Sequence, residues 1–207
     1  MAPMTAASQA ASSSSSATLF DLLKQGVSRR EIESHLDGLA IRERLEQVLA
    51  VAGKDVGRLY DAVEGAPTIA LEDIAPKSEK GTVILEGRNS LPGPVSRFQK
   101  RFQWVGDVLT GYNHQWVSPL TGPGYFVVEA APGTGAHPTE LFFDYTVTPP
   151  AAPAGWPPYK SNDRGVSKLV YGGMIDTCRR VATGVLVGKA YKHGKAEGAY
   201  FTLTAAR

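Results

Sequence analysis

The densest group of polar and aromatic side chains in this sequence is Tyr112-Asn113-His114-Gln115-Trp116. In a strand, Tyr112, His114 and Trp116 share one face, because side chains alternate between the two faces. Burying two large aromatic rings is favourable by on the order of a few kcal/mol, so this face is predicted to lie inside the protein. An imidazole held there could act as a general base, orient a ligand or ligate a metal. The alternative is a core histidine that only completes a hydrogen bond.

Lys100 is the second candidate, because it lies between Phe98 and Phe102 on the apolar face of a strand. An ammonium group on an interior face needs a carboxylate partner or an anionic ligand, since an unpaired buried charge is very costly. In a cavity, Lys100 would therefore anchor the carboxylate or enolate of a ligand. The alternative is a lysine at the barrel rim that extends its charge into water.

Arg88 follows the first strand and could donate two parallel hydrogen bonds to a carboxylate or phosphate. The alternative is a turn residue that pairs with Asp144 or Asp176. The segment around Arg88 lacks the glycine spacings of a Walker loop and of a dinucleotide-binding loop. No two histidines have the spacing of metal ligands. We therefore predict no cofactor and no metal.

The composition excludes several classes of protein. The 207 residues include 22 Lys+Arg and 20 Asp+Glu, a balance that indicates neither a nucleic-acid partner nor an acidic membrane. No apolar run is long enough to span a bilayer. Cys178 is the only cysteine, so an internal disulfide is impossible, and we expect a small core side chain there. Because the first 17 residues also lack the basic start and apolar core of a secretory signal, we expect a cytoplasmic protein.

The elements that must position these residues fall into two groups. Residues 1–17 are rich in Ala and Ser and are predicted to form a disordered tail. Residues 18–66 have helical apolar spacing and a capping box at Ser28 and Glu31, which predicts a small helical subdomain. Residues 67–207 contain about nine short alternating segments separated by Gly and Pro. The fold class is therefore α+β, with an antiparallel β-barrel that keeps a cavity.

Two strands and one loop are central to the predicted cavity. Gly106-Asp107 fits a two-residue hairpin turn between residues 97–105 and 108–117. We expect this hairpin to bring both aromatic faces to the same interior, with a bulge where the register requires one. The Pro-rich segment 148–165 is predicted to cross the barrel mouth, with Trp156 or Tyr159 as a cover. The predicted ligand-binding residues are Arg88, Lys100, Phe102, Trp104, Trp116, Tyr125 and Tyr145, and the predicted catalytic residues are His114 and Tyr112.

The end of the chain resembles bacterial calycin-like families, among them the uncharacterised families named for a Gly-x-Trp-x-Gly signature. The signature itself is absent, because no tryptophan precedes Gly87. The resemblance implies a lipocalin-like barrel completed by a late strand pair, and it carries no ligand or haem chemistry to this chain. It rests on Glu86-Gly87-Arg88 and on the segments 169–176, 179–181, 185–191 and 200–203.

The preferred hypothesis is non-covalent binding of a small hydrophobic or amphipathic molecule, including lipids, in the barrel cavity. A ligand with an anionic group would pair with Lys100. The first alternative is an isomerase, cyclase or lyase that uses His114 and a tyrosine in the same cavity. The second alternative is a protein-interaction module with a solid barrel. No nucleic-acid partner or membrane span is expected, and the sequence leaves the oligomeric state open.

Overall fold

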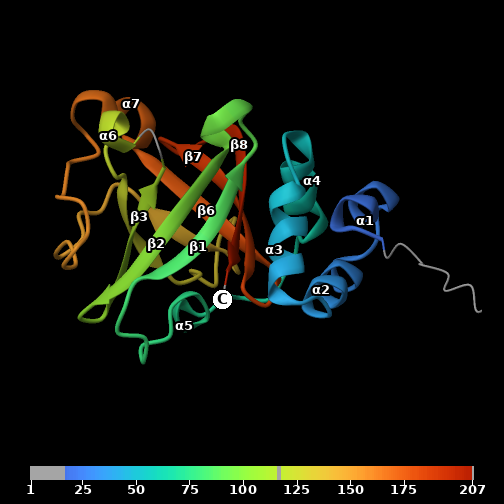
Figure 1. Cartoon of the computed structure of the whole chain (residues 1–207). Helices are drawn as coiled ribbons and strands as arrows, with labels where there is room; N and C mark the ends of the chain where they lie inside the picture. Colours follow the sequence, from blue (N-terminus) through green and yellow to red (C-terminus); the bar gives the residue numbers. More distant parts are fainter. Residues whose placement is uncertain (1–16, 116–117, 207) are drawn as a thin grey trace, which may run out of the picture.

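The computed structural model describes residues 17–115 and 118–206, in which eight antiparallel strands form a closed barrel (Figure 1). The strands follow one another around the barrel in chain order, and β1 closes it by pairing with β8. The predicted antiparallel barrel is confirmed. Its strands are β1 (Val83–Asn89), β2 (Arg97–Val105), β3 (Val108–His114), β4 (Tyr125–Glu129), β5 (Leu141–Asp144), β6 (Met174–Ala182), β7 (Val185–Lys192) and β8 (Lys195–Ala205).

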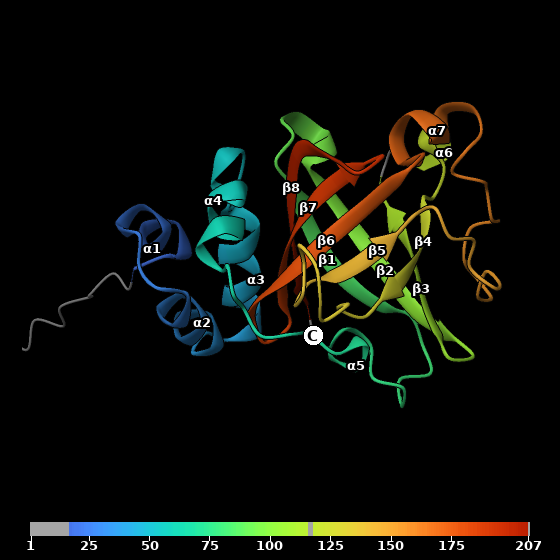
Figure 2. The same ribbon diagram turned by 180° about the vertical axis from the view of Figure 1, so that it is seen from behind.

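Helices lie beside the barrel and at both of its ends (Figure 2). Four of them contact the outside of β1 and of β6 to β8, or one another: α1 (Leu19–Gln25), α2 (Arg29–Asp37), α3 (Ile41–Ala50) and α4 (Lys54–Ala62). The short helix α5 (Leu71–Ile74) lies at one end of the barrel. The opposite end carries α6 (Ser118–Thr121), α7 (Gly165–Tyr171) and a single 3-10 turn (Gly93–Ser96). Within the described residues, no helix is long and apolar enough to cross a bilayer.

The predicted capping box and helical apolar spacing are present. Ser28 and Glu31 form the expected reciprocal capping box at the start of α2. The apolar faces of the helices pack on outward-facing valines of the barrel. A buried polar cluster also links α4 to the barrel. Tyr60 of α4 donates to Glu140 at 2.9 Å, and Arg179 of β6 donates to the same carboxylate at 2.7 Å. The Arg179 Nη1 atom also donates to the Tyr60 carbonyl at 2.8 Å, so helix and strand are joined through both groups.

Phenylalanine rings fill the middle of the barrel by lying over glycines on neighbouring strands. A β-carbon at Gly111 would lie 2.4 Å from the Phe126 ring, so the close approach of this ring requires a glycine. A β-carbon at Gly87 would likewise lie 2.6 Å from the Phe98 ring, and one at Gly188 would lie 2.2 Å from the Phe201 ring. The glycine side of each pair leaves room for the ring, which adds packing where a glycine alone would weaken the sheet. Among the described strands, the cross-strand pairs are Gly87 with Phe98, Gly111 with Phe126, and Gly188 with Phe201.

Two predicted features of the barrel are wrong. The segment Leu169–Tyr171 belongs to α7 and not to a strand, so β6 begins only at Met174. The Pro-rich segment 148–165 does not cover the barrel mouth. Its Trp156 ring contacts the outward-facing Tyr112 ring with 4.7 Å between centroids, and its Nε1 atom donates to Thr82 at 2.8 Å. The segment therefore covers part of the outer surface of the barrel.

Candidate functional site

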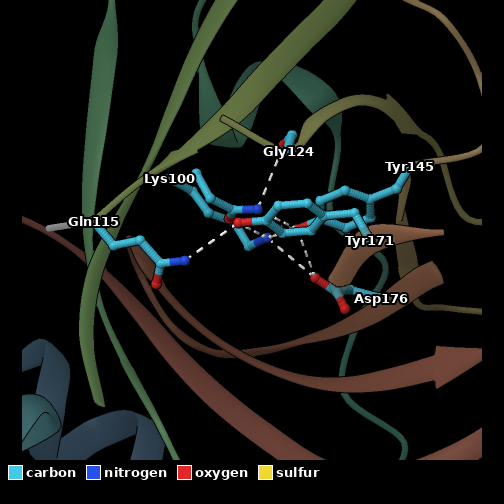
Figure 3. Close-up of polar contacts among 7 residues, drawn as sticks. Lys100, Gln115, Gly124, Tyr145, Tyr171 and Asp176 are labelled. Carbon is cyan, nitrogen blue, oxygen red and sulfur yellow. Dashed lines mark hydrogen bonds and ion pairs between the residues drawn. The ribbon is translucent and has the colours of Figure 1, made fainter. Parts of the chain in front are cut away.

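Lys100 lies inside the barrel on β2, with only 2% of its surface exposed. Its ammonium group donates to Asp176 Oδ2 at 3.1 Å, to Asn113 Oδ1 at 3.0 Å and to the Tyr145 hydroxyl. Figure 3 shows Lys100 of β2, Asp176 of β6 and Tyr145, which directly follows β5, pointing toward one another. The three acceptors match the three hydrogens of the ammonium group, so Lys100 is fully satisfied within the protein.

The network continues from Lys100 toward the α7 end of the barrel (Figure 3). The Tyr145 hydroxyl donates to Asp176 at 3.1 Å and accepts from Asn113 Nδ2 at 2.9 Å. The Tyr145 ring stacks on Tyr171 with 5.5 Å between centroids and 7° between planes. The Tyr171 hydroxyl in turn accepts from Gln115 Nε2 at 3.2 Å. Aromatic stacking and hydrogen bonds thus connect the barrel centre to the last residue of α7.

Burial dominates the electrostatics of this network. It lowers the pKa of Lys100 and raises the pKa of Asp176, while the attraction between the two charges opposes both shifts. Burial also raises the pKa of Tyr145, so its hydroxyl stays protonated and can donate. Five aromatic rings add cation–π contacts, with the ammonium 4.6 Å from Phe126 and 5.0 Å from Phe143. An amine in this setting would be a base or nucleophile only if a substrate could reach it.

A pocket of about 540 Å³ lies at the α5 end of the barrel, where β1 begins and β8 ends. Its volume falls within the range of roughly 300–1,000 Å³ that is typical of small-molecule sites. The described residues that line it include Leu85 but not Lys100, although Leu85 faces Lys100 across β1 and β2. The apolar lining includes Ile69, Ile74, Val83, Leu85, Leu186 and Ala205, and the charged lining comprises Asp73, Glu79, Glu86 and Arg180.

His114 and Tyr112 do not face the barrel interior, and the expectation that they do is wrong. The hairpin turn pairs Trp104 with Leu109 and Lys100 with Asn113, with no bulge between them. Alternation along β3 therefore turns Tyr112 and His114 outward. Tyr112 is buried beneath Trp156, and His114 is exposed. Partial burial and the Arg101 charge lower the pKa of His114.

The remaining predicted ligand-binding residues divide between the two surfaces of the barrel. Phe102 and Tyr145 lie inside it, together with Lys100. Trp104 is also inside, near α5, where its Nε1 atom donates to the Ala75 carbonyl at 2.7 Å. Arg88 and Tyr125 do not lie inside: Arg88 donates to the Leu49 carbonyl of α3 at 2.8 Å, and Tyr125 donates to the Pro157 carbonyl at 2.6 Å. Trp116 lies outside the described residues.

The sequence predicts a carboxylate partner or an anionic ligand for Lys100, with Asp176 considered as an alternative partner of Arg88. Asn113, Tyr171 and Gln115 were missed. The length of the hairpin turn is the signal that could have found Asn113, because a two-residue turn without a bulge pairs it with Lys100. Tyr171 and Gln115 meet only through the packing of α7 on the barrel end. The pocket lining was missed as well, since its leucines resemble ordinary core residues in the sequence.

Within residues 17–115 and 118–206, no three His, Cys, Asp or Glu side chains lie close enough together to hold a metal ion. The chain matches no family model, and neither a curated protein nor a solved structure is significantly similar to it. The functional interpretation therefore rests on the barrel, its end pocket and the network around Lys100.

Proposed function

We propose that this protein binds a small hydrophobic or amphipathic molecule non-covalently in the pocket at the α5 end of the barrel. The observation that carries the proposal is the pocket itself: about 540 Å³, with apolar side chains along the lining and a few charged groups. Such a combination provides burial energy for an apolar body and orientation for one polar group. The middle of the barrel is filled by phenylalanines, so the ligand would occupy only this end.

The charges of the lining bear on the kind of ligand. Asp73, Glu79 and Glu86 contribute three carboxylates against the single guanidinium of Arg180. The donors of Lys100 are used within the protein, so they do not compensate this excess. A ligand carboxylate would be repelled by the acidic groups, whereas a hydroxyl or amine could donate to them. We therefore favour a neutral or cationic ligand over the anionic one that the sequence suggested.

The fold is compatible with this proposal. A closed antiparallel meander of eight strands is the architecture of lipocalin-type barrels. This strand order supports the calycin-like resemblance at the level of architecture. The contacts of α2, α3 and α4 with the barrel support a helical subdomain packed beside it. A cytoplasmic location belongs to the same proposal. The alternative enzyme loses its expected site, because His114 and Tyr112 lie outside the barrel.

A neutral fluorescent probe, N-phenyl-1-naphthylamine, tests the proposal directly. We expect saturable binding by the parent protein and competition by neutral or cationic amphiphiles. Ala205→Phe would place a ring in the pocket and should weaken probe binding at least tenfold. Leu169→Phe is the matched control, because Leu169 is exposed at the opposite end of the barrel. Absence of saturable binding, or equal binding by a folded Ala205→Phe variant, would exclude this pocket as the site.

A further inference from the structure

Large apolar side chains project into solvent at the end of the barrel opposite to the pocket. Leu120 of α6 is 73% exposed, and Leu169 and Val166 of α7 are 76% and 43% exposed. The two helices are in contact, and Ser167 Oγ of α7 donates to the Thr121 carbonyl of α6 at 2.7 Å. Figures 1 and 2 both place α6 beside α7 at this end. A single exposed leucine is ordinary, but these three lie on two helices that contact each other at one end of the barrel, and we call them the apolar tip.

The opposite face of α7 is packed against the barrel. Tyr171 and Ser167 of α7 are buried, and Tyr171 stacks on Tyr145 at the barrel centre. The helix thus has its own anchored face, and Leu169 lies on the other one. Its backbone is held as well, because Lys192 Nζ donates to the Leu169 carbonyl at 2.7 Å. Leu169 is therefore presented by a fixed part of the fold.

Cationic side chains surround the tip. The β7–β8 turn lies against it, since the His193 amide donates to the Gly173 carbonyl at 2.8 Å. Lys160 lies close to the end of α6, near Gly122. Within the described segments 118–122, 160–171 and 192–197, the formal charge is +3, which exceeds the +2 of the whole chain. The charged residues of these segments are Lys160, Asp163, Arg164, Lys168, Lys192, Lys195 and Glu197.

We propose that this end of the barrel docks on a membrane surface that contains anionic lipids. Leu120, Val166 and Leu169 would enter the boundary between headgroups and acyl chains, as apolar residues of peripheral proteins do. The surrounding lysines and arginine would contact the acidic headgroups, which lie at the cytoplasmic leaflet in cells. The cationic residues would complement either an anionic membrane or an acidic protein surface. The exposed apolar residues at the centre of the patch favour the membrane, because they can enter its apolar boundary region. The proposal is independent of the ligand pocket, which lies at the other end.

Co-sedimentation with vesicles tests this proposal on the full chain. We expect binding to vesicles of phosphatidylcholine and phosphatidylserine, weak binding to phosphatidylcholine alone, and loss of binding as salt rises. The double variant Leu120→Ser/Leu169→Ser should bind anionic vesicles at least tenfold more weakly. The double variant Lys168→Glu/Lys195→Glu should lose the preference for phosphatidylserine, and it spares Lys192, which holds the backbone of α7. Ile41→Ser is the matched control, since Ile41 is 48% exposed on α3, away from this end, and its variant should bind like the parent.

Three results would overturn the proposal. The first is a parent protein that does not sediment with anionic vesicles at low salt. The second is equal binding by the leucine double variant, with circular dichroism showing that it is folded. The third is a parent dimer that the leucine substitutions dissociate in the absence of vesicle binding, because the patch would then join two copies of this chain. Probe binding in the pocket should stay unchanged in every variant, which separates this test from that of the proposed function.

Discussion

Lys100 and Asp176 form an ion pair across the lumen of the barrel, with 3.1 Å between Nζ and Oδ2. They come from β2 and β6, which are four strands apart in a closed barrel of eight and therefore lie on opposite walls. Asn113 and Tyr145 complete the contact from β3 and from the residue that follows β5. The pair thus joins the two walls and helps to close the centre of the barrel to ligands.

Lys100→Met should destabilise the protein by about 3–5 kcal/mol at neutral pH. The substitution leaves the Asp176 carboxylate buried without its cation, and breaking one side of a buried ion pair has a cost of that order. The double variant Lys100→Met/Asp176→Leu should recover much of the loss, because it removes both charges. Urea unfolding of the three proteins measures these differences. A Lys100→Met variant as stable as the parent would show that the pair contributes nothing to the fold.

Gly111→Ala should destabilise the barrel by about 1–3 kcal/mol, the usual cost of overpacking. The added methyl group would lie 2.4 Å from the Phe126 ring and 3.0 Å from the Arg101 carbonyl. Phe126→Leu in the same chain should relieve part of the strain, since a smaller side chain leaves room for the methyl group. Gly81→Ala is the control, because its methyl group would meet only the flexible Glu79 side chain, at 3.5 Å. Thermal unfolding should separate the two alanine variants clearly.

Acid should weaken the attachment of α4 to the barrel through Glu140. Burial raises the pKa of Glu140, but hydrogen bonds from Thr177, Arg179 and Tyr60 outweigh it and lower the pKa below its ordinary value of 4.5. The folded state therefore binds fewer protons than the unfolded chain near this pH. The stabilisation from Glu140 is complete above pH 4.5 and is lost as the pH falls through the folded pKa.

Glu140→Gln tests this pH dependence. The variant should be less stable than the parent at pH 7, because Arg179 loses its buried carboxylate. The difference between the two proteins should shrink as the pH falls below 4.5, which urea unfolding at several pH values would measure. Asp107→Asn is the control, since Asp107 is almost fully exposed. A stability difference that does not change with pH would assign the pH dependence to other groups.

The regular parts of the fold could be predicted from the sequence because they depend on local patterns. The capping box at Ser28 and the hairpin turn at Gly106 each act within a few residues, and both are present. The face assignment of β3 failed because both faces of that strand carry aromatic or polar residues, so hydrophobic alternation does not distinguish them. The interior of β3 contains Gly111, which was not recognised as the partner of a phenylalanine.

The centre and the end pocket depended on contacts between distant segments. Lys100 and Asp176 are 76 residues apart, and no local pattern shows that their strands face each other across the barrel. The register of the hairpin at Gly106 predicts that Asn113 lies beside Lys100. Placing Asp176 opposite Lys100 also requires the order of the strands around the barrel. The length of the Pro-rich segment and its aromatic residues predict a lid over the barrel mouth. Its rings instead cover Tyr112 and Tyr125, the aromatics whose outward direction was missed.

Trp156→Ala should therefore lower the free energy of unfolding, because packing on the outside of the barrel is lost, and should leave ligand binding unchanged. Its ring contacts Tyr112 and Tyr125, and its indole donates to Thr82, so the substitution removes packing and one hydrogen bond. Because Trp156 is only partly buried, the loss should be below the roughly 3–5 kcal/mol of a core tryptophan. Limited proteolysis should cut residues 148–165 faster in the variant, at the same rate with and without N-phenyl-1-naphthylamine. Trp156→Phe keeps a ring and should fall between variant and parent. Protection of this segment by the probe, or weaker probe binding by the variant, would contradict this prediction and indicate that the segment acts as a lid.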